Sequence, residues 1–343
     1  AVRFTFAALA TTGRDIRFDL GRVEGYRNFC NKLWNASRYV VMNTTGEECG
    51  PNGEMEFSLA DRWIRSRFGR TIETVIESFA SYRLDLAARA IYEFTWNEFC
   101  DWYLELSKPI LQSEDSSDAE RLGTRRTLVE ILEALLRLIH PVMPFISEEI
   151  WRKLAPLAHV DGVSVSTQAY PRTEAFPQDK AAEDELAWVR DFILGVRQIR
   201  GEMKIPPGKA LPVLLRSASK QDRDRLERHG RFLTRLARLG AITVLESDVE
   251  PPPAATALLG EASIMVPLAG VIDVSAELAR LRKKRDRLGV DLKRSESKLA
   301  NDKFVANAPD DVVNREKQRV EEVRGAIAKI EQQLATMASL EGS

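Results

Sequence analysis

The sequence predicts a mostly α-helical protein made of a helical bundle, a small α/β module and an antiparallel two-helix coiled-coil arm. Three observations lead to this prediction. Apolar residues recur at helical spacing nearly throughout from Leu20 to Trp151. Shorter segments that alternate between strand and helix patterns follow. From Val274 to Met337, leucine, isoleucine and valine recur three and four positions apart, which is the seam of a coiled coil.

The bundle is expected over residues 1–160, with four or five helices joined by short connections. The first of these helices carries an apolar stripe on one face. Its neighbouring face carries Arg27, Asn31, Trp34 and Arg38. The later helices are expected at 61–82, 84–106, 125–140 and 144–154, with loops at 45–53 and 112–120.

An aromatic stripe runs along the expected helix 84–106. Its members are Tyr92, Trp96, Phe99 and Tyr103. Aromatic residues at helical spacing are typical of a core, and we expect this stripe to be core rather than a base-stacking surface. His140 precedes Pro141 at a helix end, where a lone histidine is expected to make a structural hydrogen bond.

The α/β module is expected over residues 161–272. It has a strand-like stretch at 163–170, a helix at 179–203, and then a strand-helix-strand-strand arrangement. The expected elements are a strand at 211–215, a helix at 220–239, a strand at 242–245 and an antiparallel pair at 255–259 and 263–267. Gly208-Lys209 is not a phosphate-binding loop, because Ala210 stands where a serine or threonine is needed.

The arm is expected over residues 273–343. Pro309 cannot lie inside a helix, so residues 301–309 form a turn and the two seams face each other. Each helix has roughly 25 residues and is about 40 Å long. The first helix carries a basic run: Arg280, Arg282, Lys283, Lys284, Arg285, Arg287, Lys293, Arg294, Lys298 and Lys303. This run is either a solvated coiled-coil face or a surface that lies against a phosphate backbone.

Composition bounds the function. The chain has 343 residues and a net charge of −1, which excludes a uniformly basic nucleic-acid binder but not a local basic patch. No apolar run approaches a membrane span and no signal peptide is present, so a cytoplasmic location is expected. The three scattered cysteines predict neither disulfides nor a zinc site. The start at Ala1, within an apolar periodic stretch, indicates a piece of a longer protein.

Four segments resemble, in the same order, the helical anticodon-binding domain of the class I aminoacyl-tRNA synthetases for valine, isoleucine, leucine and methionine. They are NKLWNA at 31–36, LADRWI at 59–64, WNEFCDWYLE at 96–105 and HPVMPFISEEIW at 140–151. The His-Ile-Gly-His and Lys-Met-Ser-Lys-Ser motifs of the catalytic domain do not occur, and no nucleophile–base set or metal-ligand cluster replaces them. No catalytic or metal-binding residue is therefore predicted.

The arm narrows the resemblance. KLANDKFVANAPDDVV at 298–313 closely resembles the carboxy-terminal arm of the bacterial-type valyl-tRNA synthetases, and the start of the chain also resembles that family. The resemblance extends from about Ala1 to Met337. An isoleucyl enzyme of bacterial type usually ends in a cysteine-rich zinc module, which this sequence lacks.

The resemblance implies partners and site residues. The parent enzyme would ligate valine to valine tRNA with ATP and Mg²⁺, whereas this chain would be a monomer that binds tRNA, needs no cofactor and catalyses nothing. The positions that match the family's anticodon contacts hold Arg38, Tyr39 and Leu104, and Arg22 lies where a further contact is expected. On the arm, Arg294 and Arg319 match residues that contact the tRNA corner. An arginine can bind base edges and phosphates, and a tyrosine can stack on an unstacked base.

Two alternatives remain at this point. One is a structural or interaction protein that dimerises through the seam from Leu278 to Leu299 and is indifferent to RNA. The other is the equivalent part of an isoleucyl or leucyl enzyme. The self-paired seams count against the first, and the turn sequence of the arm and the missing cysteine pairs count against the second.

Overall fold

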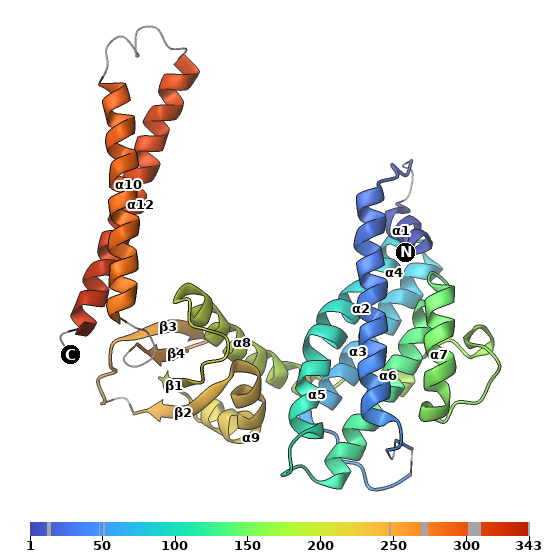
Figure 1. Ribbon diagram of the computed structural model, residues 1–343. Coiled ribbons are helices and arrows are strands. Elements are labelled where there is room, and N and C mark those ends of the chain that lie inside the picture. Colours follow the sequence, from blue (N-terminus) through green and yellow to red (C-terminus); the bar gives the residue numbers. More distant parts are fainter. Residues whose placement is uncertain are drawn as a thin grey trace. The chain divides into compact units, whose positions relative to one another are not determined.

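The computed structural model describes residues 1–11, 15–47, 49–50, 52–246, 248–268, 274–300 and 310–341 (Figure 1). Side chains at 274–281, 310–313, 326, 329, 332–333 and 335–341 are outside this description. The chain forms two compact units. The first contains Ala1–Ile193 and Asp224–Ala237, and the second contains Leu194–Arg223 and Arg238–Ser343. The expected domain boundaries at 160 and 272 remain predictions.

The first unit is a helical bundle, as predicted. Its helical elements are α1 (Val2–Leu9), α2 (Leu20–Thr44), α3 (Leu59–Ala80), α4 (Leu84–Glu93), η1 (Phe94–Tyr103), α5 (Leu104–Leu111), α6 (Asp118–Ile139), α7 (Pro144–Ala158), η2 (Val165–Thr167), η3 (Thr173–Ala175), most of α8 (Lys180–Glu202) and most of α9 (Lys220–Ala237). The inner face of α2 buries Phe29, Leu33 and Val40 completely. Periodicity predicted this face, because apolar side chains three and four apart share one side of a helix.

Two capping boxes set helix starts in the bundle. The Ser58 hydroxyl accepts from the Asp61 amide, and the Asp61 carboxylate accepts from the Ser58 amide. Ser117 and Glu120 do the same at the start of α6, which therefore begins at Asp118. The expected loop is confirmed at 112–117, but its end at 120 and the helix start at 125 were wrong, because Asp118 and Glu120 form the first turn of α6.

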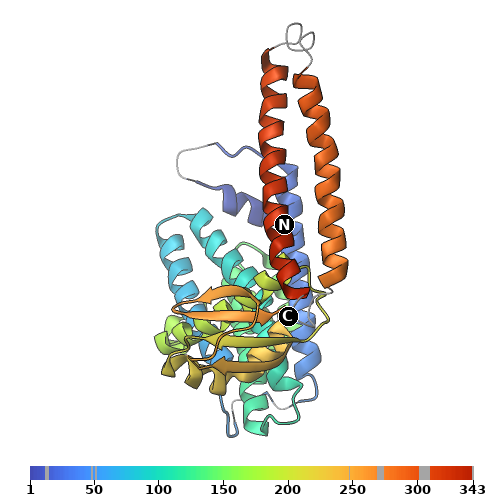
Figure 2. The same cartoon turned by 90° about the vertical axis from the view of Figure 1, so that its left-hand side faces the viewer.

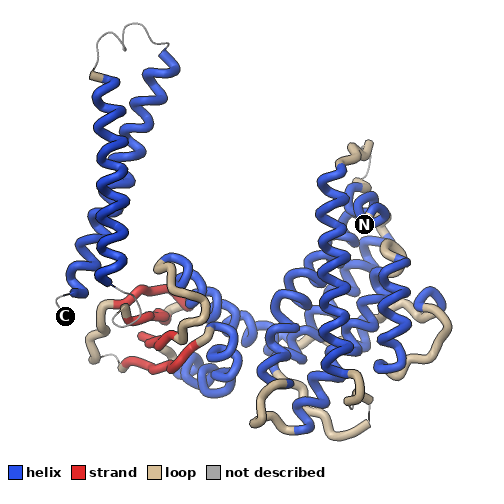
Figure 3. The backbone as a smooth tube through the Cα atoms, in the orientation of Figure 1, coloured by secondary structure: helices blue, strands red, loops and turns tan. Residues whose placement is uncertain are grey.

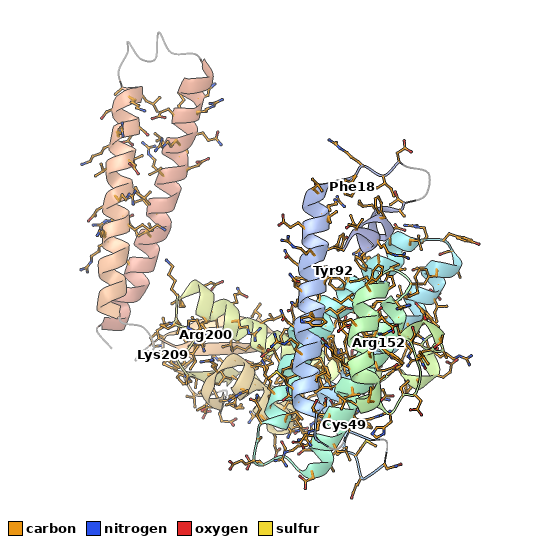
Figure 4. All side chains as sticks on the ribbon, turned by 45° about the vertical axis from the view of Figure 1, so that its right-hand side comes forward. Phe18, Cys49, Tyr92, Arg152, Arg200 and Lys209 are labelled. Carbon is orange, nitrogen blue, oxygen red and sulfur yellow. The ribbon has the colours of Figure 1, made fainter. Side chains whose placement is uncertain are left out.

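The expected single helix at 84–106 has three consecutive parts. Between α4 and α5, η1 is a π-helix from Phe94 to Tyr103, and the helical run continues to Leu111. Phe99 and Tyr103 are fully buried, so the core prediction is confirmed for them. Tyr92 and Trp96 are only half-buried and stack on each other with ring centroids 5.5 Å apart. Tyr92 lies beside α2 in Figure 4 and also contacts the Phe29 ring.

The strand expected at 163–170 was wrong. The segment contains the short 3-10 helix η2, and the Glu148 carboxylate accepts hydrogen bonds from the Ser164 hydroxyl and the Val165 amide. Val165 is buried, but Val163, in phase with it, is 88% exposed, so the alternation did not mark a buried face. Alternation alone does not supply a neighbouring strand, and here a helix side chain binds the backbone instead.

The second unit contains a four-stranded sheet, drawn in red in Figure 3. Its strands are β1 (Leu211–Arg216), β2 (Leu239–Leu245), β3 (Ala254–Leu259) and β4 (Ala262–Pro267), in the order β2-β1-β4-β3. β1 and β2 are parallel, with α9 between them in sequence, whereas β1–β4 and β3–β4 are antiparallel. All four expected strands and the helix between the first two are confirmed.

The arm consists of α10 (Val274–Leu299) and α12 (Asp310–Glu341), which lie side by side in Figures 1 and 2. The Ser295 hydroxyl of α10 donates to Glu316 of α12 at 3.1 Å, whereas Leu288, earlier on α10, packs against the cluster that contains Ile330, later on α12, so the helices are antiparallel as predicted. Ile330 packs with Leu268 at the module end of the arm. The predicted turn at 301–309 lies outside the described residues.

Replacing Gly69 by alanine should destabilise the bundle. A Cβ at this position of α3 would lie 2.1 Å from the carbonyl oxygen of Phe176. Because that neighbour is backbone, we expect the free energy of unfolding to fall by about 1–3 kcal/mol in a urea titration. Gly25 in α2 is the matched control, since nothing lies within 4 Å of the place that its added methyl group would occupy. Gly25→Ala should be neutral or raise stability by up to ~1 kcal/mol, and equal effects at the two glycines would contradict the packing argument.

Candidate nucleic-acid interface

The outer face of α2 presents the polar and aromatic residues that the sequence placed there. The Asp19 side chain caps the helix by accepting from the Gly21 amide at 2.9 Å. With Leu33 and Val40 buried against the bundle, Trp34, Asn35 and Arg38 are left exposed. These exposed residues form a ridge between two hollows, one on the side of η1 and α5 and one on the side of α7.

The first hollow, called here the Tyr39 hollow, has a volume of about 230 Å³. Its lining residues are Lys32, Asn35, Ala36, Tyr39, Cys100, Leu104, Glu105 and Lys108. Leu104 is buried and forms an apolar wall. Tyr39 and Leu104, which are far apart in sequence, are therefore brought together.

The Tyr39 ring is held in place at its hydroxyl. This oxygen shares a hydrogen bond of 2.9 Å with the Ser107 hydroxyl on α5. Burial raises the pKa of Tyr39, outweighing the Ser107 hydrogen bond that lowers it, so the phenol is neutral at physiological pH. Lys108 Nζ lies 5.8 Å from the ring centroid. The hollow thus combines a positioned aromatic ring, an apolar wall and a cation.

The second hollow, called here the Trp34 hollow, also has a volume of about 230 Å³. Its lining residues are Trp34, Ser37, Arg38, Val41 and Met42 from α2, and Ile150 and Lys153 from α7. Arg38 therefore lines a different hollow from Tyr39, although the two residues are adjacent in sequence. Neighbouring residues on a helix point about 100° apart, and here that angle separates them to two sides of the ridge.

Arg22 lies in the first turn of α2, far from both hollows. At about 1.5 Å per residue it is roughly 24 Å along the helix from Arg38. Its charge acts on Tyr26 instead, where it lowers the pKa against the larger raising effect of burial. The structure therefore does not bring Arg22 together with Arg38, Tyr39 or Leu104.

Arg294 on α10 and Arg319 on α12 lie at one level of the hairpin. Ser295 and Lys298 both bond the Glu316 carboxylate, at 3.1 Å each, which fixes the register of the two helices. Both arginines are exposed, and among the side chains that the structure describes neither has an ion-pair partner. They are thus available to an external anion.

The basic run of α10 is largely exposed. Its exposed members with described side chains are Arg282, Lys283, Lys284, Arg287, Lys293, Arg294 and Lys298. Lys298 pairs with Glu316, and Arg285 pairs with Asp286. The face therefore contains a few internal ion pairs and an excess of positive charge without an acidic partner among the described side chains.

Other residue types show structural roles. His140 Nδ1 shares a hydrogen bond of 2.8 Å with the Ser147 hydroxyl, as expected for a structural histidine. Cys30, Cys49 and Cys100 form no disulfide with one another, and burial raises the pKa of the Cys100 thiol to about 12. Within the described ranges, no group of three or more histidine, cysteine or acidic residues could hold a metal ion. No described helix is long and apolar enough to cross a membrane.

Two family models match the chain. Residues 61–215 match the anticodon-binding domain of tRNA ligases. Residues 273–338 match the valyl-tRNA synthetase tRNA-binding arm, and this second match favours a valyl enzyme over an isoleucyl or leucyl one.

The chain belongs to the valyl-tRNA synthetase family.

The chain carries tRNA-binding parts of a valyl-tRNA synthetase, and its partner is tRNA. The family resemblance, the fold class and the tRNA-binding function predicted from the sequence are confirmed. Leu104, Arg294 and Arg319 lie within the matched residues, whereas Arg38 and Tyr39 precede the first match. Helix α2 nevertheless packs against η1, α6 and α7 of the matched domain, so it belongs to the same bundle.

Sequence reasoning did not select two cations of this bundle. Lys108 lies over the Tyr39 ring, and Lys153 Nζ lies 5.3 Å from the centroid of the Trp34 ring. Each cation comes from another helix than the ring it covers, so no spacing in the sequence reveals the pair. The sequence did place Trp34 on the same face as Arg38.

Proposed function

We propose that this chain binds valine tRNA at two places. Tyr39 and Leu104 bind a base of the anticodon loop, Arg38 contacts a base edge or phosphate on the adjoining side of α2, and Arg22 contacts the backbone farther along the helix. Arg294 and Arg319 pack against the corner of the tRNA. The observation that carries the proposal is that the anticodon-binding match lies mainly in the first compact unit, whereas the arm match lies wholly in the second.

The proposal extends to the parent enzyme, a class I valine–tRNA ligase that uses ATP and Mg²⁺ in the cytoplasm. The adenylate-forming chemistry would reside outside this chain, which carries neither signature motif of the class I catalytic domain. The chain itself is expected to be a monomer, because the described parts of α10 and α12 pack against each other along their seams, where Val320 and Ile330 are buried.

The two helices of the hairpin pair with each other, which counts against the alternative of a structural protein that dimerises through this seam. The arm match likewise favours a valyl over an isoleucyl or leucyl enzyme. A mixture of valine, ATP, Mg²⁺ and valine tRNA should yield no valyl-tRNA with this chain alone, and product formation above a protein-free control would overturn that part of the proposal.

Tyr39→Ala should weaken the binding of valine tRNA. Stacking of a base on an aromatic ring contributes about 1–3 kcal/mol, so we expect the dissociation constant to rise about 5- to 150-fold. Filter binding with valine tRNA and a non-cognate tRNA measures this effect. Tyr39→Phe is the matched control, because it keeps the ring and removes only the hydrogen bond to Ser107.

The phenylalanine variant should bind within a few-fold of wild type, and the preference for valine tRNA should persist in it. Equal losses in both variants would mean that the hydroxyl, rather than ring stacking, contributes the affinity. Wild-type binding that does not distinguish valine tRNA from the non-cognate tRNA would contradict anticodon reading by this chain.

A further inference from the structure

The Trp34 hollow has the chemistry of a base-binding site, and of its lining residues only Arg38 is expected from the sequence to contact RNA. Trp34 lies at the rim of the hollow and is 36% exposed. Ile150 is 2% exposed and forms the apolar floor of the hollow. Met42, also on the rim, is 77% exposed. A large aromatic ring and a methionine left open to solvent around a hollow of about 230 Å³ indicate a surface that is covered by a partner.

Two cations, Lys153 and Arg38, line the Trp34 hollow and indicate the chemistry of the partner. Lys153 Nζ lies 5.3 Å from the Trp34 ring centroid and pairs with Glu149 at 3.2 Å. Arg38 lines the same hollow and has no ion-pair partner among the described side chains. An aromatic ring with two cations beside it suits an unstacked nucleobase, which stacks on the ring in place of the Lys153 ammonium while the cations bind the edge and phosphate of the base.

The occupant is distinct from the base in the Tyr39 hollow. Helix α2 separates the two hollows, and an α-helix with its side chains is about 10–12 Å wide. One base cannot reach both rings. A single-stranded loop that crosses the ridge at Asn35 and Arg38 can place one base on each side.

We infer that the Trp34 hollow is a second base-binding site, which takes one unstacked nucleobase of the same anticodon loop. The base stacks on Trp34, Arg38 binds its edge or its phosphate, and Lys153 binds the phosphate. This inference rests on the proposed function and adds to it Trp34 and Lys153, together with the assignment of Arg38 to a different base from that of Tyr39.

Binding of an RNA hairpin with the valine anticodon stem-loop sequence tests the site. Trp34→Ala should raise the dissociation constant about 5- to 150-fold, and Trp34→Phe should recover most of the affinity because it keeps a ring. Lys153→Ala should raise it several-fold and make its dependence on salt shallower, as expected when a phosphate contact is lost. Phe145→Ala, on the same helix α7 and 84% exposed, removes an aromatic residue outside the hollow and should bind like wild type.

A double-mutant cycle distinguishes two bases from one. If Trp34 and Tyr39 hold different bases, the fold-losses of Trp34→Ala and Tyr39→Ala should multiply in the double variant. If both act on one base, the double variant should bind about as weakly as the weaker single variant. A 2-aminopurine probe placed in turn at each loop position should show one position that responds to Trp34→Ala and another that responds to Tyr39→Ala.

The outcomes separate this inference from the function on which it rests. If wild type binds the hairpin, Tyr39→Ala weakens binding and Trp34→Ala does not, then the second site is refuted and the proposed function stands. A single loop position that responds to both variants also refutes the second site. If wild type binds neither the hairpin nor valine tRNA at low salt, the proposed function fails. Thermal melts of each variant, monitored by circular dichroism, exclude unfolding as the cause of any loss.

Discussion

Replacing Arg294 and Arg319 together by alanine should strongly weaken the binding of valine tRNA by this chain. The two guanidinium groups lie at one level of the hairpin, where Ser295 and Glu316 fix the register, and both are exposed. Two planar cations at one level of a hairpin can straddle a phosphate backbone or stack on an exposed base pair. We expect a loss of at least tenfold at low salt, and a slope of log affinity on log salt that is shallower by about one for each lost phosphate contact.

The matched control for this variant removes two other exposed arm cations from the same helices. Arg287 lies on α10, more than one turn from Arg294, and Lys317 lies on α12. The variant Arg287→Ala/Lys317→Ala changes the net charge by the same amount. It should lose less affinity than the Arg294/Arg319 variant if the paired arginines form the contact. Equal losses would mean that the arm binds through its overall charge.

Asp61→Ala should cause the largest loss of stability among the changes considered. The Asp61 carboxylate is fully buried and links three elements of the bundle. Its Oδ2 accepts from the Ser58 amide at 2.9 Å and the Thr124 hydroxyl at 2.9 Å, and its Oδ1 accepts from the Tyr103 hydroxyl at 2.6 Å. Removing the carboxylate leaves several buried donors without a partner, at about 1–3 kcal/mol each.

We therefore expect Asp61→Ala to lower the free energy of unfolding by at least ~3 kcal/mol. Asp61→Asn should cost less, because its amide oxygen can accept from Ser58 and Thr124 while its NH₂ group donates to the Tyr103 oxygen. Urea titrations of the three proteins at one pH measure the order. An alanine variant as stable as the asparagine variant would show that the hydrogen bonds contribute little.

The difference in free energy of unfolding between wild type and Asp61→Asn should depend on pH, and the pKa shift of Asp61 gives its sign. Burial raises the pKa of the Asp61 carboxyl, although hydrogen bonds from Ser58, Tyr103 and Thr124 lower it in part. The folded state therefore binds the proton more tightly than the unfolded state, whose pKa is about 3.9. Its contribution to stability is greatest below that value and decreases as pH rises through the folded pKa. The stability of wild type relative to Asp61→Asn should thus increase between pH 7 and pH 4.5.

Asp85 provides the opposite case. Its hydrogen bond with Arg83 lowers the pKa of the Asp85 carboxyl, so its contribution is present above the unfolded pKa and is lost on acidification. The stability of wild type relative to Asp85→Asn should decrease as pH falls. The same sign of trend at both aspartates would contradict the assignment of burial as the dominant cause at Asp61.

Much of the local structure followed from the sequence. The buried stripe of α2 at Phe29, Leu33 and Val40, and the antiparallel hairpin of the arm, follow from periodicity, because only a helix places residues three and four apart on one side. The start of α6 was missed although Ser117 and Glu120 form a capping box. The signal was present in the sequence, but it was interpreted as an acidic loop.

The strand expected at 163–170 failed for a different reason. Alternation in the sequence does not supply a partner for the backbone of a strand, and Val163, one of the alternating residues, is 88% exposed. Here the Glu148 carboxylate from α7 binds the Ser164 hydroxyl and the Val165 amide, and this partner is not visible in the local pattern.

By itself, the sequence determined the kinds of elements, their order and the family to which they belong, because periodicity, capping residues and motif order are properties of neighbouring positions. It also placed Trp34 and Arg38 on one face of a helix. Only the tertiary structure decided which distant residues meet. In the tertiary structure Tyr39 lies beside Leu104 and Lys108, and Trp34 lies beside Lys153. Arg38 and Tyr39 line different hollows on the two sides of the α2 ridge. Such contacts depend on how helices pack, since each hollow is formed by side chains from two or more of them.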